Sequence, residues 1–237
     1  GGGRAAAAGG GWPGGQRRRP RLWRVVNTKA LFAGKGLRLL LGGQTVSMFG
    51  DWMMIIVLGI WAKTLTGSSS QAGLVFLVLG VTGLVAPLGG LVVDRLPKRP
   101  LMIATQLSLA GVMCLLLFVH DRSDMWILYS VTLLYGLGGD LFAASRGAML
   151  KAMVPDELLG EANGAYQSIR EGLRIVAPLA GAGIFAAWGG SVVAIVDAGT
   201  FLVSAAALVA LRFPEPQPSP KDPPFTMKIT AGSTHSC

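Results

Sequence analysis

The chain has 237 residues, of which 51% are hydrophobic and 14% are charged, and its mean hydropathy is +0.54. This composition is too apolar for a soluble domain of that length and indicates a protein embedded in a lipid bilayer. The net charge of +9 does not indicate a nucleic-acid partner, because many of the basic residues precede the first apolar segment. In that position they suit contact with anionic lipid at the cytoplasmic face of a membrane.

Residues 1–36 are rich in Gly, Ala and Arg and lack the apolar residues that a core requires. We expect them to form a disordered, basic cytoplasmic tail. The remainder of the chain up to residue 212 has the composition of a membrane domain.

Six apolar segments in this domain approach the roughly 20 residues that a spanning helix needs. Lys and Arg outside the spans fall mainly on the side of the amino terminus, which places both termini in the cytoplasm. Two predicted cytoplasmic connections are Asp94–Pro100 and Lys151–Ala162. The sequence therefore predicts an all-α polytopic membrane domain over residues 37–212, with helices at Leu39–Ala62, Ala72–Val93, Leu101–Val119, Met125–Leu150, Asn163–Trp188 and Ser191–Leu211.

The first predicted helix carries a polar stripe. Gln44, Ser47 and Asp51 have spacings i, i+3 and i+7, which place them on one helix face with Asp51 near the bilayer midplane. A carboxylate at that depth is costly and should face a cavity or a partner, and desolvation favours its protonated form. Asp51 is therefore a candidate for proton exchange. The alternative is a structural, protonated Asp51 that is bonded to a neighbouring backbone carbonyl.

A short basic hairpin joins the second and third predicted helices. It resembles the cytoplasmic loop motif between the second and third helices of the major facilitator superfamily, with Val92 in place of a Leu and Pro97 in place of a Gly. The resemblance implies the six-helix half of a transporter, in which this loop holds a cytoplasmic gate during alternating access. The matching residues are Gly90, Asp94, Arg95, Lys98 and Arg99.

Two sequence echoes indicate an internal repeat. Residues 85–90 recur as residues 176–181 with one difference, and Gly50-Asp51 recurs as Gly139-Asp140. An odd number of spans separates the copies, so the second copy would be inverted, as in the 3+3 repeats of such transporter halves. This repeat would place Asp140 at a depth similar to that of Asp51. Chance similarity between Gly- and Ala-rich helices is the alternative.

The fifth predicted helix carries three charged residues. Glu171 and Arg174 are spaced i, i+3 and are expected to neutralise one another. Arg170 lacks such a partner, and Asp140 on the neighbouring helix is the candidate. The predicted substrate and proton cavity is thus lined by Gln44, Ser47, Asp51, Asp140, Arg170, Glu171 and Arg174.

The same helix also carries an antiporter-like motif. Gly164, Pro178 and Gly181 resemble the fifth-helix motif of superfamily antiporters, which implies export, although Leu173 and Ala177 replace two of its glycines.

In the fourth helix Thr132 stands where many proton-coupled members carry an Arg, so coupling is expected to rest on Asp51. In the sixth helix we expect Asp197 to make a helix-packing contact. Stretches including residues 44–52, Asp94-Arg95 and residues 197–204 resemble the branch that contains siderophore and macrolide exporters, with a likeness that covers about residues 37–212. The implied function is proton-coupled efflux of a small molecule, such as a drug or siderophore, across the plasma membrane.

Residues 213–237 are Pro-rich and polar and look like the central cytoplasmic linker of a two-half transporter, truncated. The expected partners are the lipid bilayer, a small-molecule substrate, protons and a missing carboxy-terminal half. The alternative is a truncated half-transporter that acts only as a non-transporting membrane assembly partner.

An enzyme is not expected. The two histidines, His120 and His235, lie outside the predicted spans, and there is no H-E-x-x-H or G-x-S-x-G motif. Cys114 and Cys237 have neither a disulfide framework nor metal-ligand spacing. We therefore expect no cofactor and no metal.

Overall fold

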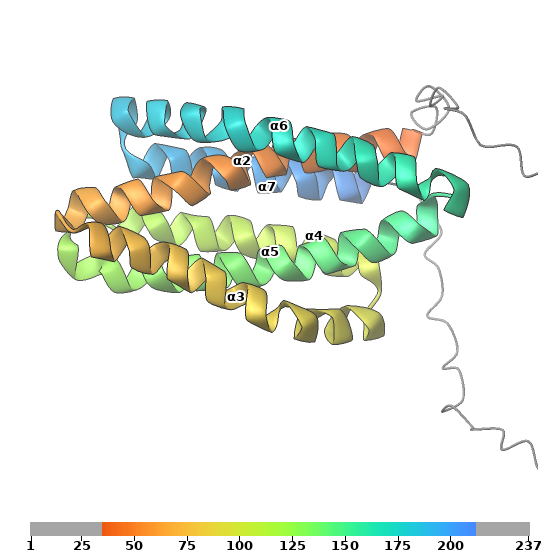
Figure 1. The fold of residues 1–237 in the computed structure, drawn as a ribbon, viewed down its shortest axis with the longest axis horizontal. Helices are drawn as coiled ribbons and strands as arrows, with labels where there is room; N and C mark the ends of the chain where they lie inside the picture. Colours follow the sequence, from red (N-terminus) through yellow and green to blue (C-terminus); the bar gives the residue numbers. More distant parts are fainter. Residues whose placement is uncertain (1–34, 212–237) are drawn as a thin grey trace, which may run out of the picture.

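The computed structural model describes residues 35–211, and in this range the chain folds into six α-helices and two short 3-10 helices, without strands. The long helices lie side by side along one axis (Figure 1). The predicted basic tail, up to residue 34, and the predicted linker lie outside the described residues. The elements are α2 (Lys35–Thr66), α3 (Ser69–Arg95), α4 (Lys98–Cys114), η1 (Leu115–Phe118), η2 (Arg122–Asp124), α5 (Met125–Met153), α6 (Asp156–Trp188) and α7 (Gly190–Ala210).

Within the described residues, five helical segments are long and apolar enough to cross a membrane. α6 is not among them, although it has 33 residues. Acidic and basic side chains are spread along its amino-terminal part as far as Arg174, and these lower its apolar character. The five segments are Arg38–Thr66, Ser69–Pro87, Lys98–Phe118, Arg122–Lys151 and Gly190–Ala210.

The connection predicted at Asp94–Pro100 is shorter than expected. α3 continues through Arg95 and α4 begins at Lys98, so that two residues lie between the helices. The prolines do not prevent this, because N–H groups in the first helical turn have no intrahelical acceptor. Pro97 is the N-cap of α4, and Pro100 lies in its first turn.

The connection predicted at Lys151–Ala162 is wrong over most of its length. α5 extends to Met153, and α6 begins at Asp156 directly after the N-cap residue Pro155. Proline is favourable at a helix start, and the acidic residue Glu157 complements the positive end of the helix dipole. The charged stretch that resembled a loop is therefore the beginning of α6.

Two glycines make the reversals at the opposite end of the bundle. Gly67 has a φ of 70° and donates its N–H to the Lys63 carbonyl at 2.8 Å, which ends α2. Gly189 has a φ of 82° and donates to the Phe185 carbonyl at 2.8 Å, which ends α6. Glycine adopts this left-handed backbone without the steric cost of a side chain.

The helices form two groups of three (Figure 1). α2 packs mainly against α6 and α7, α5 packs mainly against α3 and α4, and α4 and α7 join the two groups. Both ends of the described chain lie at the end of the bundle that also holds the α3–α4 and α5–α6 connections (Figure 1). The chain therefore crosses the length of the bundle an even number of times.

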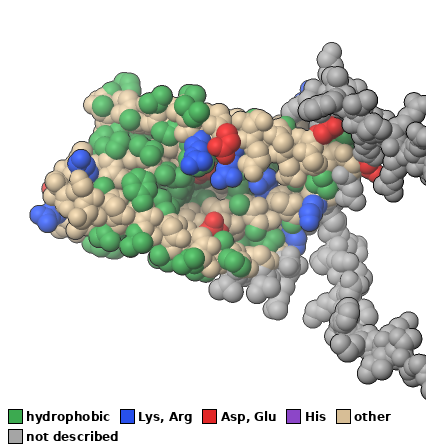
Figure 2. Space-filling view, viewed as in Figure 1, with side chains coloured by type: hydrophobic (Ala, Val, Ile, Leu, Met, Phe, Trp, Pro, Cys, Tyr) green, Lys and Arg blue, Asp and Glu red, His purple; other side chains and the backbone are tan. Residues whose placement is uncertain are grey.

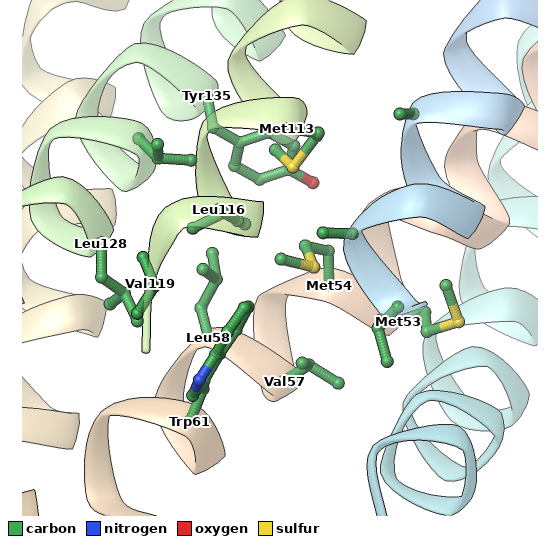
Figure 3. Packing of buried hydrophobic residues seen from close by; sticks show 14 of the residues in the cluster. Met53, Met54, Val57, Leu58, Trp61, Met113, Leu116, Val119, Leu128 and Tyr135 are labelled. Atoms are coloured by element: carbon green, nitrogen blue, oxygen red, sulfur yellow. The ribbon is translucent and has the colours of Figure 1, made fainter. Parts of the chain in front are cut away.

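The apolar core lies where α2, α4, α5 and α7 meet. Figure 3 shows Met53 and Met54 of α2 in this cluster, together with Met113 of α4 and Leu128 of α5. In a bilayer, helices associate through close packing, because lipid is as apolar as the side chains themselves. Small residues at helix contacts are therefore as important as the large ones.

Glycines bring α2 close to its neighbours. A Cβ atom at Gly50 would overlap the Asp197 carboxylate and the Thr200 hydroxyl of α7. Asp197 is fully buried, and Thr200 donates to its Oδ1 at 3.2 Å. Asp197 thus lies in a helix contact, as the sequence predicted.

Candidate functional site

A cavity of about 530 Å³ lies between α2, α3, α5 and α6. Its volume falls in the range of about 300–1,000 Å³ that is typical of small-molecule sites. Figure 2 shows the hollow between α6 and α3, with basic and acidic side chains at its rims and hydrophobic side chains around it. Its charged and polar lining residues are Asp51, Thr82, Tyr135, Asp140, Arg146, Tyr166 and Arg170.

Asp51 is held in the wall of this cavity by Tyr135. The Tyr135 hydroxyl donates to Asp51 Oδ1 at 3.0 Å and lies 3.2 Å from the Asp51 backbone carbonyl. Tyr135 comes from α5, packs against Phe201 of α7 and is 5% exposed. Asp51 is half-buried, and its carboxyl group therefore faces the cavity with one fixed hydrogen-bond donor.

The predicted polar stripe of α2 also lines a second, smaller cavity of about 90 Å³. Gln44, Ser47 and Asp51 all reach it, as their helical spacing predicted. Gln106 of α4 donates to the hydroxyl of Ser47 at 3.2 Å and to that of Ser204 at 2.6 Å. Gln44 Nε2 and Gln106 Oε1 are buried without a hydrogen-bond partner. Such atoms require water or ligand groups, and this cavity has the polar walls that water needs.

Asp140 lines the large cavity together with Asp51, but it does not pair with Arg170 as predicted. The Arg170 guanidinium instead lies over the ring of Trp52, with Cζ 5.9 Å from the centroid, and donates to Gln167 at 3.5 Å. Asp140 Oδ2 is buried and has no hydrogen-bond donor. The aromatic ring of α2 therefore takes the position next to Arg170 that the sequence assigned to Asp140.

Glu171 and Arg174 form the ion pair that their spacing predicted, at 3.5 Å. Their side chains are 58% and 61% exposed, so screening by solvent makes the contribution of this ion pair to stability small. Arg174 also lies 5.5 Å from the ring of Trp52. Neither residue lines the two cavities described above, although both were expected at the site.

Arg146 is a charged residue of the cavity that the predicted set of site residues did not include. Its guanidinium stacks on the ring of Tyr166, with Cζ 3.7 Å from the centroid, and its Nε is buried without an acceptor. It lines both cavities. An arginine inside a predicted span was the available signal, since such residues usually face the interior of a bundle.

The basic hairpin residues bind the ends of neighbouring helices. Lys98 donates to the carbonyl oxygens of Val93 and Leu96, the latter at 3.0 Å. Arg99 donates to the carbonyls of Leu208 at 3.1 Å and Val209 at 2.8 Å, at the carboxyl end of α7. Cations stabilise helix carboxyl ends in this position.

The other residues of the hairpin motif are Gly90, Asp94 and Arg95. Gly90 is half-buried, and a Cβ atom there would meet no neighbour within 4 Å. The side chains of Asp94 and Arg95 lie outside the described part of the chain. The gating role of the hairpin therefore stays a prediction.

The antiporter-like residues occupy different environments on α6. A Cβ atom at Gly164 would meet nothing within 4 Å, whereas one at Gly181 would lie 2.8 Å from the Met53 carbonyl oxygen of α2. Pro178 lies inside α6 between them. Gly181 therefore serves a close helix–helix contact, and the motif's role in export stays a prediction.

Membrane-length helices around a charged cavity of ligand size are the architecture of a membrane transporter. The chain matches the Major Facilitator Superfamily over residues 40–235, and it belongs to this superfamily of transporters, which are not enzymes. This confirms the family that the hairpin motif indicated.

Two relatives are informative. The chain is 29% identical over 186 residues to the uncharacterized MFS-type transporter YfiS of Bacillus subtilis, covering 77% of this chain and 44% of YfiS. It is 25% identical over 179 residues to macrolide efflux protein A of Streptococcus pyogenes, covering 73% of this chain and 44% of that protein. The chain thus spans about 44% of the length of the curated relatives it matches.

Proposed function

We propose that this chain is the amino-terminal half of a proton-coupled exporter of small molecules in the plasma membrane. The observation that carries the proposal is the shared cavity, into which two helices each contribute a carboxyl group, Asp51 from α2 and Asp140 from α5. An ionised carboxylate within a membrane-embedded bundle is costly unless it is paired, so each of the two groups favours the retention of a proton. Proton release and binding at the pair would drive the exchange with substrate.

The two carboxyl groups also hold corresponding places in the proposed 3+3 inverted repeat. In that repeat α2 corresponds to α5, α3 to α6 and α4 to α7, and α6 is counted as a membrane span in addition to the five apolar segments. The packing supports this, because α2 contacts α6 and α7 while α5 contacts α3 and α4. Pro87 in α3 and Pro178 in α6 are also matching positions of the sequence echo.

Export is supported by the similarity to a protein named for macrolide efflux. Export by alternating access requires a second half. The two relatives are long enough to contain one, because the matched region is 44% of their length. Exposed apolar side chains on α3 and α6, such as Leu84 at 81% and Leu179 at 72%, are available to lipid or to that half.

The test is proton flux in inside-out membrane vesicles that contain the complete transporter. We expect an imposed pH gradient, acidic inside the vesicle, to drive uptake of a substrate, and substrate addition to release protons from the vesicle lumen. A protonophore should abolish uptake. Substrate uptake that persists without any pH gradient would contradict proton coupling.

The alternative function, a non-transporting assembly partner, makes a different prediction for the 237-residue chain alone. An assembly partner should form a defined complex with another membrane protein in detergent and show no substrate-dependent proton flux in liposomes. Size measurement and flux measurement on the same preparation separate the two functions.

The proposed orientation has both termini and the α3–α4 hairpin in the cytoplasm. Cysteines introduced at Lys98 and at Ser123 lie near opposite ends of the bundle and should react with a membrane-impermeant maleimide from opposite sides. Intact cells should label Ser123→Cys, and inside-out vesicles should label Lys98→Cys. Cys114 and Cys237, the two native cysteines, are both replaced by Ser in the two variants to remove background labelling. Labelling of both cysteines from one side would contradict the six-span topology.

A further inference from the structure

The geometry points to a subsite for an anionic group at Arg146 and Arg170, in the same cavity as Asp51 and Asp140. This inference rests on the proposed function and names its substrate class, a zwitterion. Such a molecule carries a carboxylate or similar anionic group for the arginines and a protonated amine for the carboxyl groups.

Arg146 is arranged as an anion-binding group. The ring of Tyr166 covers one face of its guanidinium at 3.7 Å, and its Nε–H is buried without an acceptor. Stacking on an aromatic ring uses the face of a guanidinium and leaves the in-plane N–H donors to a ligand. A buried donor without a partner is rare in folded proteins and marks a place where an acceptor is expected.

Arg170 adds a second guanidinium to the same cavity. It lies four residues after Tyr166 on α6, which puts the two side chains on one helix face. Its contacts are the Trp52 ring at 5.9 Å and a long, 3.5 Å hydrogen bond to Gln167. Two cations that line one cavity repel one another, and a bound anion relieves that repulsion.

The two carboxyl groups of the cavity, Asp51 and Asp140, form no ion pair with the arginines. Asp140 Oδ2 is buried without a donor, and Asp51 Oδ1 accepts a hydrogen bond from the neutral Tyr135 hydroxyl. Among the residues that the structure describes, the one ion pair is that between Glu171 and Arg174, outside the cavity. The four charged groups of the cavity therefore do not neutralise one another directly.

Charge-assisted hydrogen bonds would form at both ends of a zwitterion. A carboxylate matches the forked N–H donors of a guanidinium and accepts two hydrogen bonds at once. An ammonium group supplies the donor that the buried Oδ2 atom of Asp140 lacks. A molecule with a single charge leaves one of the two sets unpaired in a poorly solvated site, which lowers its affinity.

The test measures binding of three fluorescent probes to the 237-residue chain in nanodiscs of phosphatidylcholine. Norfloxacin carries both an amine and a carboxylate, its methyl ester retains the amine charge alone, and N-acetyl norfloxacin retains the carboxylate alone. We expect norfloxacin to bind at least about tenfold more tightly than either derivative, which corresponds to about 1.4 kcal/mol.

Two arginine variants test whether the anionic group of the probe binds at Arg146 and Arg170. Arg146→Gln and Arg170→Gln should each lower the affinity for norfloxacin toward that of the methyl ester, while the affinity for the methyl ester itself stays unchanged. Arg170 is exposed, so its variant is expected to fold even if loss of the buried Arg146 side chain disturbs the bundle. Arg122→Gln, an exposed arginine remote from the cavity lining, is the matched control and should change neither affinity.

Equal affinity for norfloxacin and its methyl ester, or no binding of any probe to a monodisperse sample, would overturn the inference. So would a loss of affinity for both compounds by the same factor in the arginine variants. The measurement needs neither transport nor a pH gradient. Selective binding without proton flux in the complete transporter would therefore count against the proposed function alone, and flux without charge selectivity would count against the zwitterion subsite alone.

Discussion

Substitution of Asp51 by Asn should abolish proton-driven efflux in the complete transporter and leave the protein folded in the membrane. A charged carboxylate at the centre of a spanning helix costs about 2.5–3.5 kcal/mol on insertion scales, so its retention calls for a compensating role. Asn has the same shape and keeps an oxygen that can accept the hydrogen bond from Tyr135, which is 3.0 Å long in the native protein. The variant therefore removes ionisation and little else.

Uptake driven by a pH gradient in inside-out vesicles measures this effect, and size-exclusion chromatography in detergent reports the fold. Glu157→Gln is the matched control, because Glu157 is an exposed acid at the start of α6, away from the cavity. The control should transport at the native rate. Efflux by Asp51→Asn that keeps its rate and its pH dependence would reduce Asp51 to a packing residue.

Substitution of Gly181 by Ala should destabilise the bundle at the contact between α2 and α6. The new methyl group would overlap the Met53 Cγ atom and would lie 2.8 Å from the Met53 carbonyl oxygen and 3.2 Å from its Cα atom. Backbone atoms cannot move aside as a flexible side chain can, so the two helices must separate. Overpacking of this kind costs about 1–3 kcal/mol.

Thermal unfolding in detergent should show this loss as a lower melting temperature, by about 2–4 °C for each kcal/mol. Gly183→Ala is the matched control on the same helix, since a Cβ atom there meets nothing within 4 Å. Met53→Ala should relieve the contact only in part, because it removes the Cγ atom but leaves the carbonyl oxygen and Cα atom of residue 53 in place. A native melting temperature for Gly181→Ala would show that α2 and α6 are not in close contact.

Both predictions concern α2, which contributes Asp51 to the cavity and Met53 to the contact with α6. These residues are two positions apart and therefore point to different sides of the helix. Displacement of α2 from α6 would also displace Trp52 from Arg170, which it faces at 5.9 Å. We therefore expect Gly181→Ala to impair transport as well as stability.

The sequence alone was sufficient for the membrane class, the all-α fold and the positions of the long helices, since these depend on apolar composition and segment length. It also placed Gln44, Ser47 and Asp51 on one face, and they do line one cavity, because side-chain direction repeats regularly along a helix. The hairpin motif led to the correct superfamily. Charged helix starts were misread as loops, because polarity alone does not distinguish a loop from the capped first turns of α6.

The tertiary structure decided which groups meet across helices. Tyr135 reaches Asp51 from 84 residues away, and Gln106 reaches Ser47 from 59 residues away, so no local pattern contains either pair. Arg146 faces the cavity and Arg170 faces Trp52 because each helix has a particular rotation and depth against its neighbours. Helical periodicity determines which residues share a face, but only packing against the neighbouring helices determines what that face contacts.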